Sequence, residues 1–286
     1  MIRYAKPTSL DDALGLLGET QWRILAGGTD FYPALGARPL RENVLDINGL
    51  AELRGIARTA SHIVIGARTT WTDIIGADLP PAFDALKQAA REVGSVQIQN
   101  TASVAGNLCN ASPAADGAPP LLILDAEVEL RSLAGTRHLP LGDFILGNRR
   151  TALRKNELLT AVRIPKNSIG GSSSFQKLGA RRYLVISIAM AAARVEVEGG
   201  VVVDAAVAVG SCSAVAMRLT ALEAALQGVV VGPALRRVVA GGQLTELTPI
   251  DDVRGSAEYR LEAAREIVAR AVLAASDHSV TETVAA

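Results

Sequence analysis

The first 55 residues alternate between helical and strand-like hydrophobic patterns. Ser9 followed by Asp12 is typical of a helix N-cap, and apolar residues then recur at helical spacing as far as Leu17. Short apolar runs at residues 22–26 and 44–47 are typical of buried strands, and the first runs directly into two glycines. This order of elements predicts a small α/β unit at the N-terminus.

The middle of the chain continues the mixed pattern up to about residue 165. Branched apolar residues predict strands at residues 62–67, 127–131 and 158–164. Thr70 is typical of the start of a short helix, and residues 81–93 have the spacing of a longer one. Together these elements predict a mixed α+β domain.

A stretch rich in glycine and serine at residues 166–174 predicts a linker, and the pattern changes after it. Two β-rich runs, at residues 187–197 and 201–209, are joined through a pair of glycines that is typical of a hairpin. Three helical stretches follow, at residues 218–226, 233–240 and 257–274. We therefore expect two domains, at residues 1–170 and 171–286, with subdomains of about 1–55 and 56–170 in the first.

The segment from residue 95 to residue 120 holds almost no side chain large enough to build a core. Its Gly106 lets a backbone come close to a ligand, and its Asn107 and Asp116 can then bond to that ligand. Loops of this length are uncommon inside compact domains and are usually functional. We expect a loop wrapped around a large polar ligand; the alternative is a structural loop packed on its own atoms.

Composition and charge narrow the class of protein. The chain has 286 residues, 49% of them hydrophobic, and 29 basic residues balance 29 acidic ones, so no net charge favours nucleic acid or an anionic membrane. No apolar run approaches the roughly 20 residues of a membrane span. Asp11 and Asp12 lie where a signal peptide would be apolar. These features predict a cytoplasmic protein without a membrane span.

Cysteines and histidines indicate no metal centre in this chain. Cys109 and Cys212 form no CxxC pattern, which excludes a cysteine-ligated iron–sulfur cluster or structural zinc site. The three histidines lie far apart along the chain, and no residue set typical of acid–base catalysis stands out. We expect Cys109 to be a buried, inert thiol, and we expect neither a metal site nor a catalytic residue.

Two further motifs point to a cofactor. Residues 26–30, with the sequence AGGTD, place two glycines and a hydroxyl group directly after a predicted strand. Backbone N–H groups in such a turn can bind an anion, although the motif is also compatible with an ordinary glycine turn. Lys177, just beyond the predicted linker, is either a solvated surface charge or a cation that stabilises a reduced, negatively charged cofactor.

Together, these motifs resemble one family, the FAD-binding medium subunits of molybdenum hydroxylases. This family includes the medium subunit of carbon monoxide dehydrogenase and the flavin domain of xanthine dehydrogenase. The resemblance covers nearly the whole chain and is carried by residues 26–30, 101–116, 177–182 and 254–260. It implies an α+β fold: a vanillyl-alcohol-oxidase-type (PCMH-type) FAD-binding domain of two subdomains, and a smaller C-terminal α+β domain of antiparallel sheet and helices.

The resemblance also implies which residues contact FAD. The pyrophosphate is expected on the backbone amides of Ala26, Gly27, Gly28, Thr29, Asp30 and Phe31. The ribityl–diphosphate path is expected along Ala102, Ser103, Gly106, Asn107 and Cys109, with hydrogen bonds from Ala115 and Asp116. Leu153 is expected near the adenine and Lys177 beside the isoalloxazine, with Ile186 and Tyr183 as looser correspondences. Ala105 departs from the family pattern, which often has a second glycine there.

The implied function is electron transfer through FAD within a heterotrimer. In this family a large molybdopterin subunit oxidises the substrate, and a small subunit with [2Fe-2S] clusters passes electrons to the flavin. The flavin then delivers them to an external acceptor such as NAD or a quinone. Two alternatives remain: a self-contained FAD-dependent oxidoreductase of the same fold, and a non-catalytic FAD-binding scaffold subunit.

Overall fold

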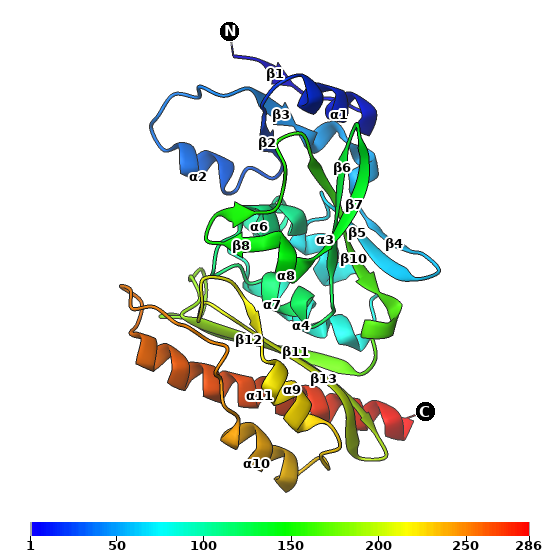
Figure 1. Cartoon of the computed structure of the whole chain (residues 1–286), viewed down its shortest axis with the longest axis vertical. Coiled ribbons are helices and arrows are strands. Elements are labelled where there is room, and N and C mark those ends of the chain that lie inside the picture. Colours follow the sequence, from blue (N-terminus) through cyan, green and yellow to red (C-terminus); the bar gives the residue numbers. More distant parts are fainter. Residues whose placement is uncertain (1, 286) are drawn as a thin grey trace.

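The structure is a computed structural model that describes the backbone of residues 2–285 and the side chains of residues 2–277. Three units follow one another along the long axis of the molecule, with the N-terminal unit and the C-terminal sheet at opposite ends (Figure 1). Each unit has its own sheet, of three, five and four strands, and a two-stranded ribbon accompanies the middle one. The mixed helix-and-sheet fold is therefore confirmed.

The N-terminal unit is a three-stranded parallel sheet of order β1-β3-β2, covered by helix α1. Ser9 caps α1 as predicted, because its hydroxyl oxygen accepts the N–H of Asp12 at 3.2 Å. Leucines on the inner face of this helix pack in a cluster with Trp22 and Leu45. The elements are β1 (Tyr4–Ala5), α1 (Leu10–Glu19), β2 (Arg23–Leu25), α2 (Phe31–Leu35), β3 (Val44–Asp46), and the 3-10 helices η1 (Ile47–Gly49) and η2 (Ala51–Leu53).

The middle unit is built on an antiparallel sheet of order β4-β5-β10-β6-β7. Its strands are β4 (Ile56–Arg58), β5 (His62–Gly66), β6 (Glu127–Ser132), β7 (Gly135–Pro140) and β10 (Leu158–Pro165). Strands β4 and β7 lie at the edges of the sheet and are largely exposed. They therefore lack the apolar alternation that predicted β5, β6 and β10. The ribbon consists of β8 (Ile145–Gly147) and β9 (Arg150–Thr151).

Helices pack beside the middle sheet. Thr70 and Asp73 form a capping box at the start of α3, which confirms the helix start predicted at Thr70. Trp71 and Phe83 are fully buried in the core beneath these helices. The elements are α3 (Trp71–Gly76), η3 (Pro81–Phe83), α4 (Asp84–Glu92), α5 (Val96–Gln99), α6 (Val104–Asn110), α7 (Ala118–Leu122) and α8 (Leu141–Phe144).

The expectation of a long loop at residues 95–120 is wrong, because α5, α6 and the start of α7 lie within it. Ser103 caps α6 by accepting the N–H of Gly106 at 3.1 Å. Val104 and Leu108 anchor that helix in the core with no exposed surface. The small residues between these anchors let short helices pack closely rather than leaving the chain irregular.

The expectation of a linker at residues 166–174 is also wrong over its second half. Residues 172–174 are buried in strand β11 (Ser172–Leu178), after the 3-10 helix η4 (Lys166–Ser168). Buried hydroxyls require partners. Ser172 donates to the carbonyl of Ala275 at 2.7 Å, and Ser173 donates to that of Ala82 at 2.7 Å. The serines that predicted a flexible linker thus join strand β11 to residues Ala275 and Ala82 of neighbouring segments.

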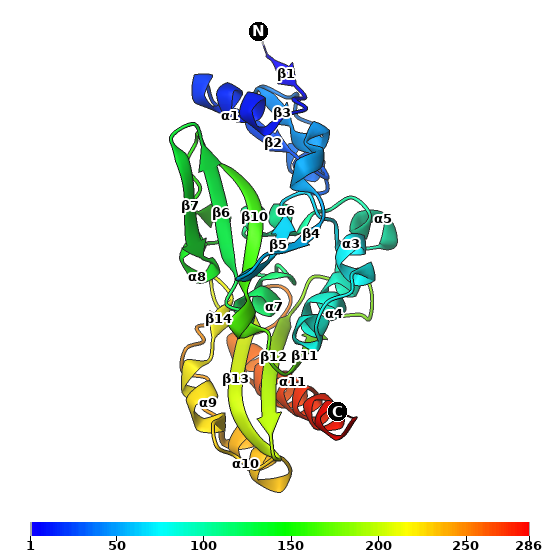
Figure 2. The same ribbon diagram turned by 90° about the vertical axis from the view of Figure 1, so that its right-hand side faces the viewer.

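The C-terminal sheet, of order β11-β12-β13-β14, is antiparallel and buried on both faces. Along β12, Ala189, Ala191 and Ala193 belong to the cluster under α11, whereas Met190 and Ala192 belong to the core of the middle unit. Small side chains on both faces let α11 lie close along the strands (Figures 1 and 2). The predicted hairpin is β12 (Ala189–Glu198) and β13 (Val201–Gly210), followed by β14 (Met217–Arg218), α9 (Thr220–Leu226), α10 (Pro233–Gly241) and α11 (Ala257–Ala285).

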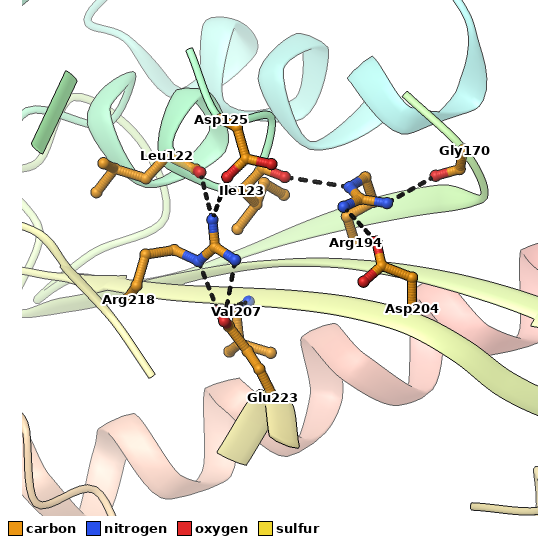
Figure 3. A network of polar contacts seen from close by, with 9 residues as sticks. All are labelled: Leu122, Ile123, Asp125, Gly170, Arg194, Asp204, Val207, Arg218 and Glu223. Carbon is orange, nitrogen blue, oxygen red and sulfur yellow. Dashed lines mark hydrogen bonds and ion pairs between the residues drawn. The ribbon is translucent and has the colours of Figure 1, made fainter. Parts of the chain in front are cut away.

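Two arginines of the C-terminal sheet hold the end of α7 (Figure 3). Arg194 donates to the carbonyl of Ile123 at 3.1 Å, and Arg218 donates to that of Leu122 at 2.9 Å. Each guanidinium also binds a carboxylate, that of Asp204 or Glu223. Cations at the carbonyl end of a helix satisfy its free acceptors, so these contacts fasten the C-terminal sheet to the middle unit.

Candidate cofactor site

A cleft of about 450 Å³ lies where the N-terminal unit meets the middle unit. This volume is typical of small-molecule sites. The structure brings most of the predicted cofactor residues to its walls: Ala26, Gly27, Gly28, Thr29, Asp30, Phe31, Ala102, Ser103, Gly106, Asn107, Cys109 and Leu153.

The glycine turn after β2 forms one wall. Across the described chain, the backbone N–H groups of Gly28, Thr29 and Asp30 donate to no other group. Gly28 has φ +76°, a left-handed conformation that favours glycine. A Cβ on Gly27 would lie 2.0 Å from the carbonyl oxygen of Thr101. Close contact between the two units therefore requires Gly27, and the free N–H groups beside it can bind an anion.

Helix α6 forms the opposite wall. A Cβ built on Gly106 would meet only the hydroxyl of Ser103, at 3.0 Å, so the backbone of this residue is otherwise open. Ala105 also lines the cleft, and it is almost completely buried. The wall thus presents bare backbone and small side chains, which allow a ligand to approach closely.

Two buried polar atoms beside the cleft have no partner among the described residues. They are Oδ1 of Asn107 and Nε1 of Trp71, and both residues line the cleft. Gly117 lies against both, because its Cβ would be 2.5 Å from the Trp71 ring and 2.9 Å from Asn107 Oδ1. Buried polar groups are costly when unpaired, so these atoms suit a cleft that receives a polar ligand.

Five predicted cofactor residues do not line this cleft. Ala115 is buried, and Ile186 is exposed, as is Tyr183, on the connection between β11 and β12. Asp116 and Lys177 form an ion pair, with Nζ 2.6 Å from Oδ2, and both side chains are less than a tenth exposed. The structure therefore places these five residues outside the cleft, and it joins two of them, Asp116 and Lys177, directly.

The Asp116 carboxylate is fully engaged within the protein. Ser187 donates to its other oxygen at 2.6 Å, while Lys177 also contacts the carbonyl of Glu92 at 3.4 Å. Burial raises the pKa of Asp116 above its ordinary value, although the charge of Lys177 and both hydrogen bonds act in the opposite direction. The lysine is thus a buried, paired cation rather than a solvated surface charge.

The expectation that Cys109 is buried is wrong, because its side chain is exposed where it lines the cleft. Desolvation by the protein packed around the cleft nevertheless raises the pKa of its thiol to about 12. The sulfur is accessible from the cleft and is protonated at neutral pH, which leaves it a weak nucleophile.

Two residues at the cleft carried no signal in the sequence: Arg23, which lines it, and Arg149, which contacts two of the lining residues. Arg23 lies over the ring of Phe31, with its guanidinium carbon 4.3 Å from the ring centroid. Arg149 contacts Asn110 and lies 3.9 Å from the carboxylate of Asp30. Arg149 comes from a turn distant in the chain, so only the fold brings it to this site.

The cleft has the features that a dinucleotide cofactor needs. Free backbone N–H groups face a wall of bare backbone, as close binding of a diphosphate requires. Apolar and aromatic residues such as Ile98 and Phe31 supply surface for ring systems. Within the described residues, no group of three metal-ligating side chains occurs, and no helix is long and apolar enough to span a membrane.

Comparison with known proteins identifies the two parts of the chain. Residues 1–167 match the FAD binding domain in molybdopterin dehydrogenase, and residues 174–275 match the CO dehydrogenase flavoprotein C-terminal domain. The chain is 31% identical to the xanthine dehydrogenase FAD-binding subunit of Escherichia coli, over 95% of this chain and 96% of that one. It is 29% identical to the carbon monoxide dehydrogenase medium chain of Hydrogenophaga pseudoflava, over 95% and 96% of the two chains.

Solved structures give the same result. A chain of reconstituted CO dehydrogenase from Oligotropha carboxidovorans superposes with a TM-score of 0.90 at 30% identity, covering 97% of this chain and 98% of that chain. Quinoline 2-oxidoreductase from Pseudomonas putida gives a TM-score of 0.86 at 26% identity, with 98% of each chain covered. The fold, the matched FAD-binding domain and the relatives define an FAD-binding flavoprotein of the oxidoreductase class. The chain belongs to the family of FAD-binding medium subunits of molybdenum hydroxylases, which confirms the resemblance.

Proposed function

We propose that this chain is the electron-transfer subunit of a heterotrimeric molybdenum hydroxylase in the cytoplasm. Its bound FAD would take electrons from the [2Fe-2S] clusters of a small partner subunit and pass them to an external acceptor such as NAD or a quinone. A large partner subunit would hold the molybdopterin cofactor. Support comes from relatives named as medium chains and from similar solved structures described as Cu,Mo-CO dehydrogenase.

The free backbone of the glycine turn is the observation that carries this proposal. The N–H groups of residues 28–30 would bind the FAD pyrophosphate, with Ala26, Gly27 and Phe31 shaping the turn. On the opposite wall, the ribityl–diphosphate path would run along Ala102, Ser103, Gly106, Asn107 and Cys109, and Leu153 would pack near the adenine.

The buried ion pair would act at the other end of the cofactor. Lys177 would lie beside the isoalloxazine, where its positive charge would favour a reduced, anionic ring. Asp116 and Ala115 would hold this lysine and the segment before α7 in place, and Ile186 would contact the same end of the cofactor.

The cleft favours electron transfer over direct oxidation of a small substrate. Two charged side chains line the cleft, those of Arg23 and Asp30. Arg23 forms an ion pair with Glu42, and the Asp30 side chain is more than half exposed. Cys109 is protonated at neutral pH. A self-contained oxidoreductase would need an acid or base beside its substrate, and these residues suit that role poorly.

We also propose a division of the chain near residue 170, into residues 1–170 and 171–286, with subdomains of about 1–55 and 56–170. A cluster that lies wholly beyond residue 170, from Ala189 to Ala275, supports the first boundary. A cluster of residues 10–53 with Leu158 supports the boundary between the subdomains.

Co-expression tests this function. The chain would be produced alone and together with the proposed small and large partner subunits. Reduction of the flavin would then be followed after a substrate of the large subunit is added. Flavin reduced only in the assembled complex supports electron transfer between subunits. An isolated chain whose FAD is reduced directly by a small substrate would favour the self-contained oxidoreductase. FAD that stays oxidised in the active complex would favour the scaffold.

A further inference from the structure

A second, smaller pocket of about 130 Å³ lies behind the glycine turn. It shares Ala26, Gly27 and Ser103 with the cofactor cleft. Its remaining walls are polar side chains and backbone from both the N-terminal and the middle units: Asn48, Arg54, Arg68, Thr70, Asn100 and Thr101. The pocket therefore lies across the boundary at which those two units meet.

The charge of this lining is not balanced. It contains two arginines and no acidic side chain. Arg54 is compensated from outside the pocket, because it forms two hydrogen bonds of 2.9 Å with Asp73. Among the residues that the structure describes, Arg68 donates only to a carbonyl oxygen, that of Leu50, at 2.7 Å. One guanidinium is thus left without a carboxylate partner.

Arg68 also carries a buried donor that nothing satisfies. Its Nε is buried and has no hydrogen-bond partner among the described residues. Burial and the charge of Arg54 lower the pKa of this guanidinium, and the charge of Asp46 offsets the effect only in part. A partly buried cation whose buried Nε donor is unpaired is stabilised when a negatively charged acceptor binds to it.

Other donors line the same pocket. The hydroxyl groups of Thr70 and Ser103 accept backbone N–H bonds but donate to no described residue. The side-chain amide of Asn100 accepts from Thr72 and likewise leaves its N–H₂ group available. Several donors and one uncompensated cation around a small volume are the arrangement that binds an oxyanion.

We propose that this pocket binds a small tetrahedral oxyanion, such as a phosphate group, separately from the cofactor cleft. The anion contacts Arg68 on the middle unit and lies beside the turn at Gly27 on the N-terminal unit, so it joins the two units that form the cleft. Two sources could supply a phosphate group to this pocket: a free anion, or the pyrophosphate of an FAD bound in the adjoining cleft, which shares three lining residues with the pocket. The separation of the two pockets behind the Gly27–Thr101 contact favours the free anion.

Calorimetric titration of inorganic phosphate into the full chain, reconstituted with FAD, tests this site. Chloride at equal ionic strength is the control for a general salt effect. We expect saturable binding of phosphate and none of chloride. Arg68→Met should weaken that binding about tenfold or more, the loss expected for a charged hydrogen bond. The matched variant Arg58→Met should leave it unchanged, because Arg58 bonds to Asp78 outside the pocket.

Two further variants keep the test decisive if Arg68→Met does not fold. Arg68→Lys retains the charge but loses the planar set of donors, and Arg54→Met removes the second cation, so each should weaken phosphate binding. Unchanged affinity in both would overturn the proposal, as would the absence of saturable binding. Phosphate that binds only the flavin-free chain and is displaced by FAD would assign the pocket to the pyrophosphate and overturn a separate site. Visible absorbance reports FAD independently of the heat, so failure of the cofactor assignment is distinguishable.

Discussion

Lys177 on strand β11 and Asp116 before helix α7 form a buried ion pair with Nζ 2.6 Å from Oδ2. The two residues are 61 positions apart in the chain. This pair links the C-terminal sheet to the segment that leads from the cofactor cleft. It also gives Lys177 a specific partner within the protein, which the sequence did not predict.

Breaking this pair should destabilise the protein. Lys177→Met leaves a buried carboxylate without its cation, so we expect the free energy of unfolding to fall by about 3 kcal/mol. Urea denaturation of the flavin-free chain measures the change. Lys155→Met, at an exposed position, is the matched control and should change stability little. Equal stability of Lys177→Met and the parent chain would contradict the pairing.

Gly106→Ala should separate cofactor binding from folding. The added methyl group meets only the Ser103 hydroxyl and otherwise enters the cleft, so FAD affinity should fall at least about tenfold, while helix α6 gains or keeps its stability. Equilibrium titration with FAD and thermal melting of the flavin-free chain measure the two effects. Gly15→Ala in α1, where the added Cβ meets nothing within 4 Å, should leave FAD affinity unchanged and raise the melting temperature slightly, because alanine favours a helix more than glycine does. Undiminished FAD affinity in Gly106→Ala would remove this residue from the site.

Gly27→Ala should act differently, through the fold itself. Its methyl group would overlap the backbone carbonyl of Thr101, at 2.0 Å, so the turn and the α5–α6 connection must move apart. We expect a loss of about 2 kcal/mol in the flavin-free chain, together with loss of FAD binding. Thermal melting without FAD distinguishes this variant from Gly106→Ala. A melting temperature equal to that of the parent chain would show that the contact yields easily.

Glu157 should contribute stability that depends on pH. Burial alone would raise its pKa, but hydrogen bonds from Arg137 and from the Arg154 N–H hold that pKa below the ordinary value. A lowered acid pKa stabilises the fold above the pKa of the unfolded chain, and this stability is lost as pH falls through the folded pKa. Glu157→Gln should therefore be less stable by about 2 kcal/mol at neutral pH, with a gap that closes in acid. Urea denaturation over a pH series checks this, and a gap independent of pH would contradict it.

Local signals in the sequence predicted much of the fold. The Ser9 cap, the Thr70 helix start and the hairpin at Gly199 and Gly200 depend on neighbouring residues, and the structure contains all three. The failures share a physical cause. Residues 172–174 form a buried strand because their hydroxyls find partners on distant elements, and small residues in α6 form a helix because its two anchors reach the core. The local sequence pattern shows neither the hydrogen-bond partners of these serines nor the core contacts of the α6 anchors.

The candidate site was predictable where it depends on a contiguous motif. The glycine turn and the residues of α6 line the cleft together. Residues brought in by tertiary structure were not predictable, among them Arg149 beside Asp30 and the unpaired Trp71 Nε1. The pairing of Lys177 with Asp116 likewise depends on the packing of β11 against the segment before α7.

Reconstitution of the purified full chain with FAD is the most direct test of the central claim. The flavin content after removal of free cofactor is read from the visible absorbance, in the parent chain and in Gly106→Ala. We predict stoichiometric FAD in the parent chain and a clear loss in the variant, with both chains equally folded by circular dichroism. A folded parent chain that retains no FAD, or a variant that retains as much as the parent, would contradict the assignment of this cleft.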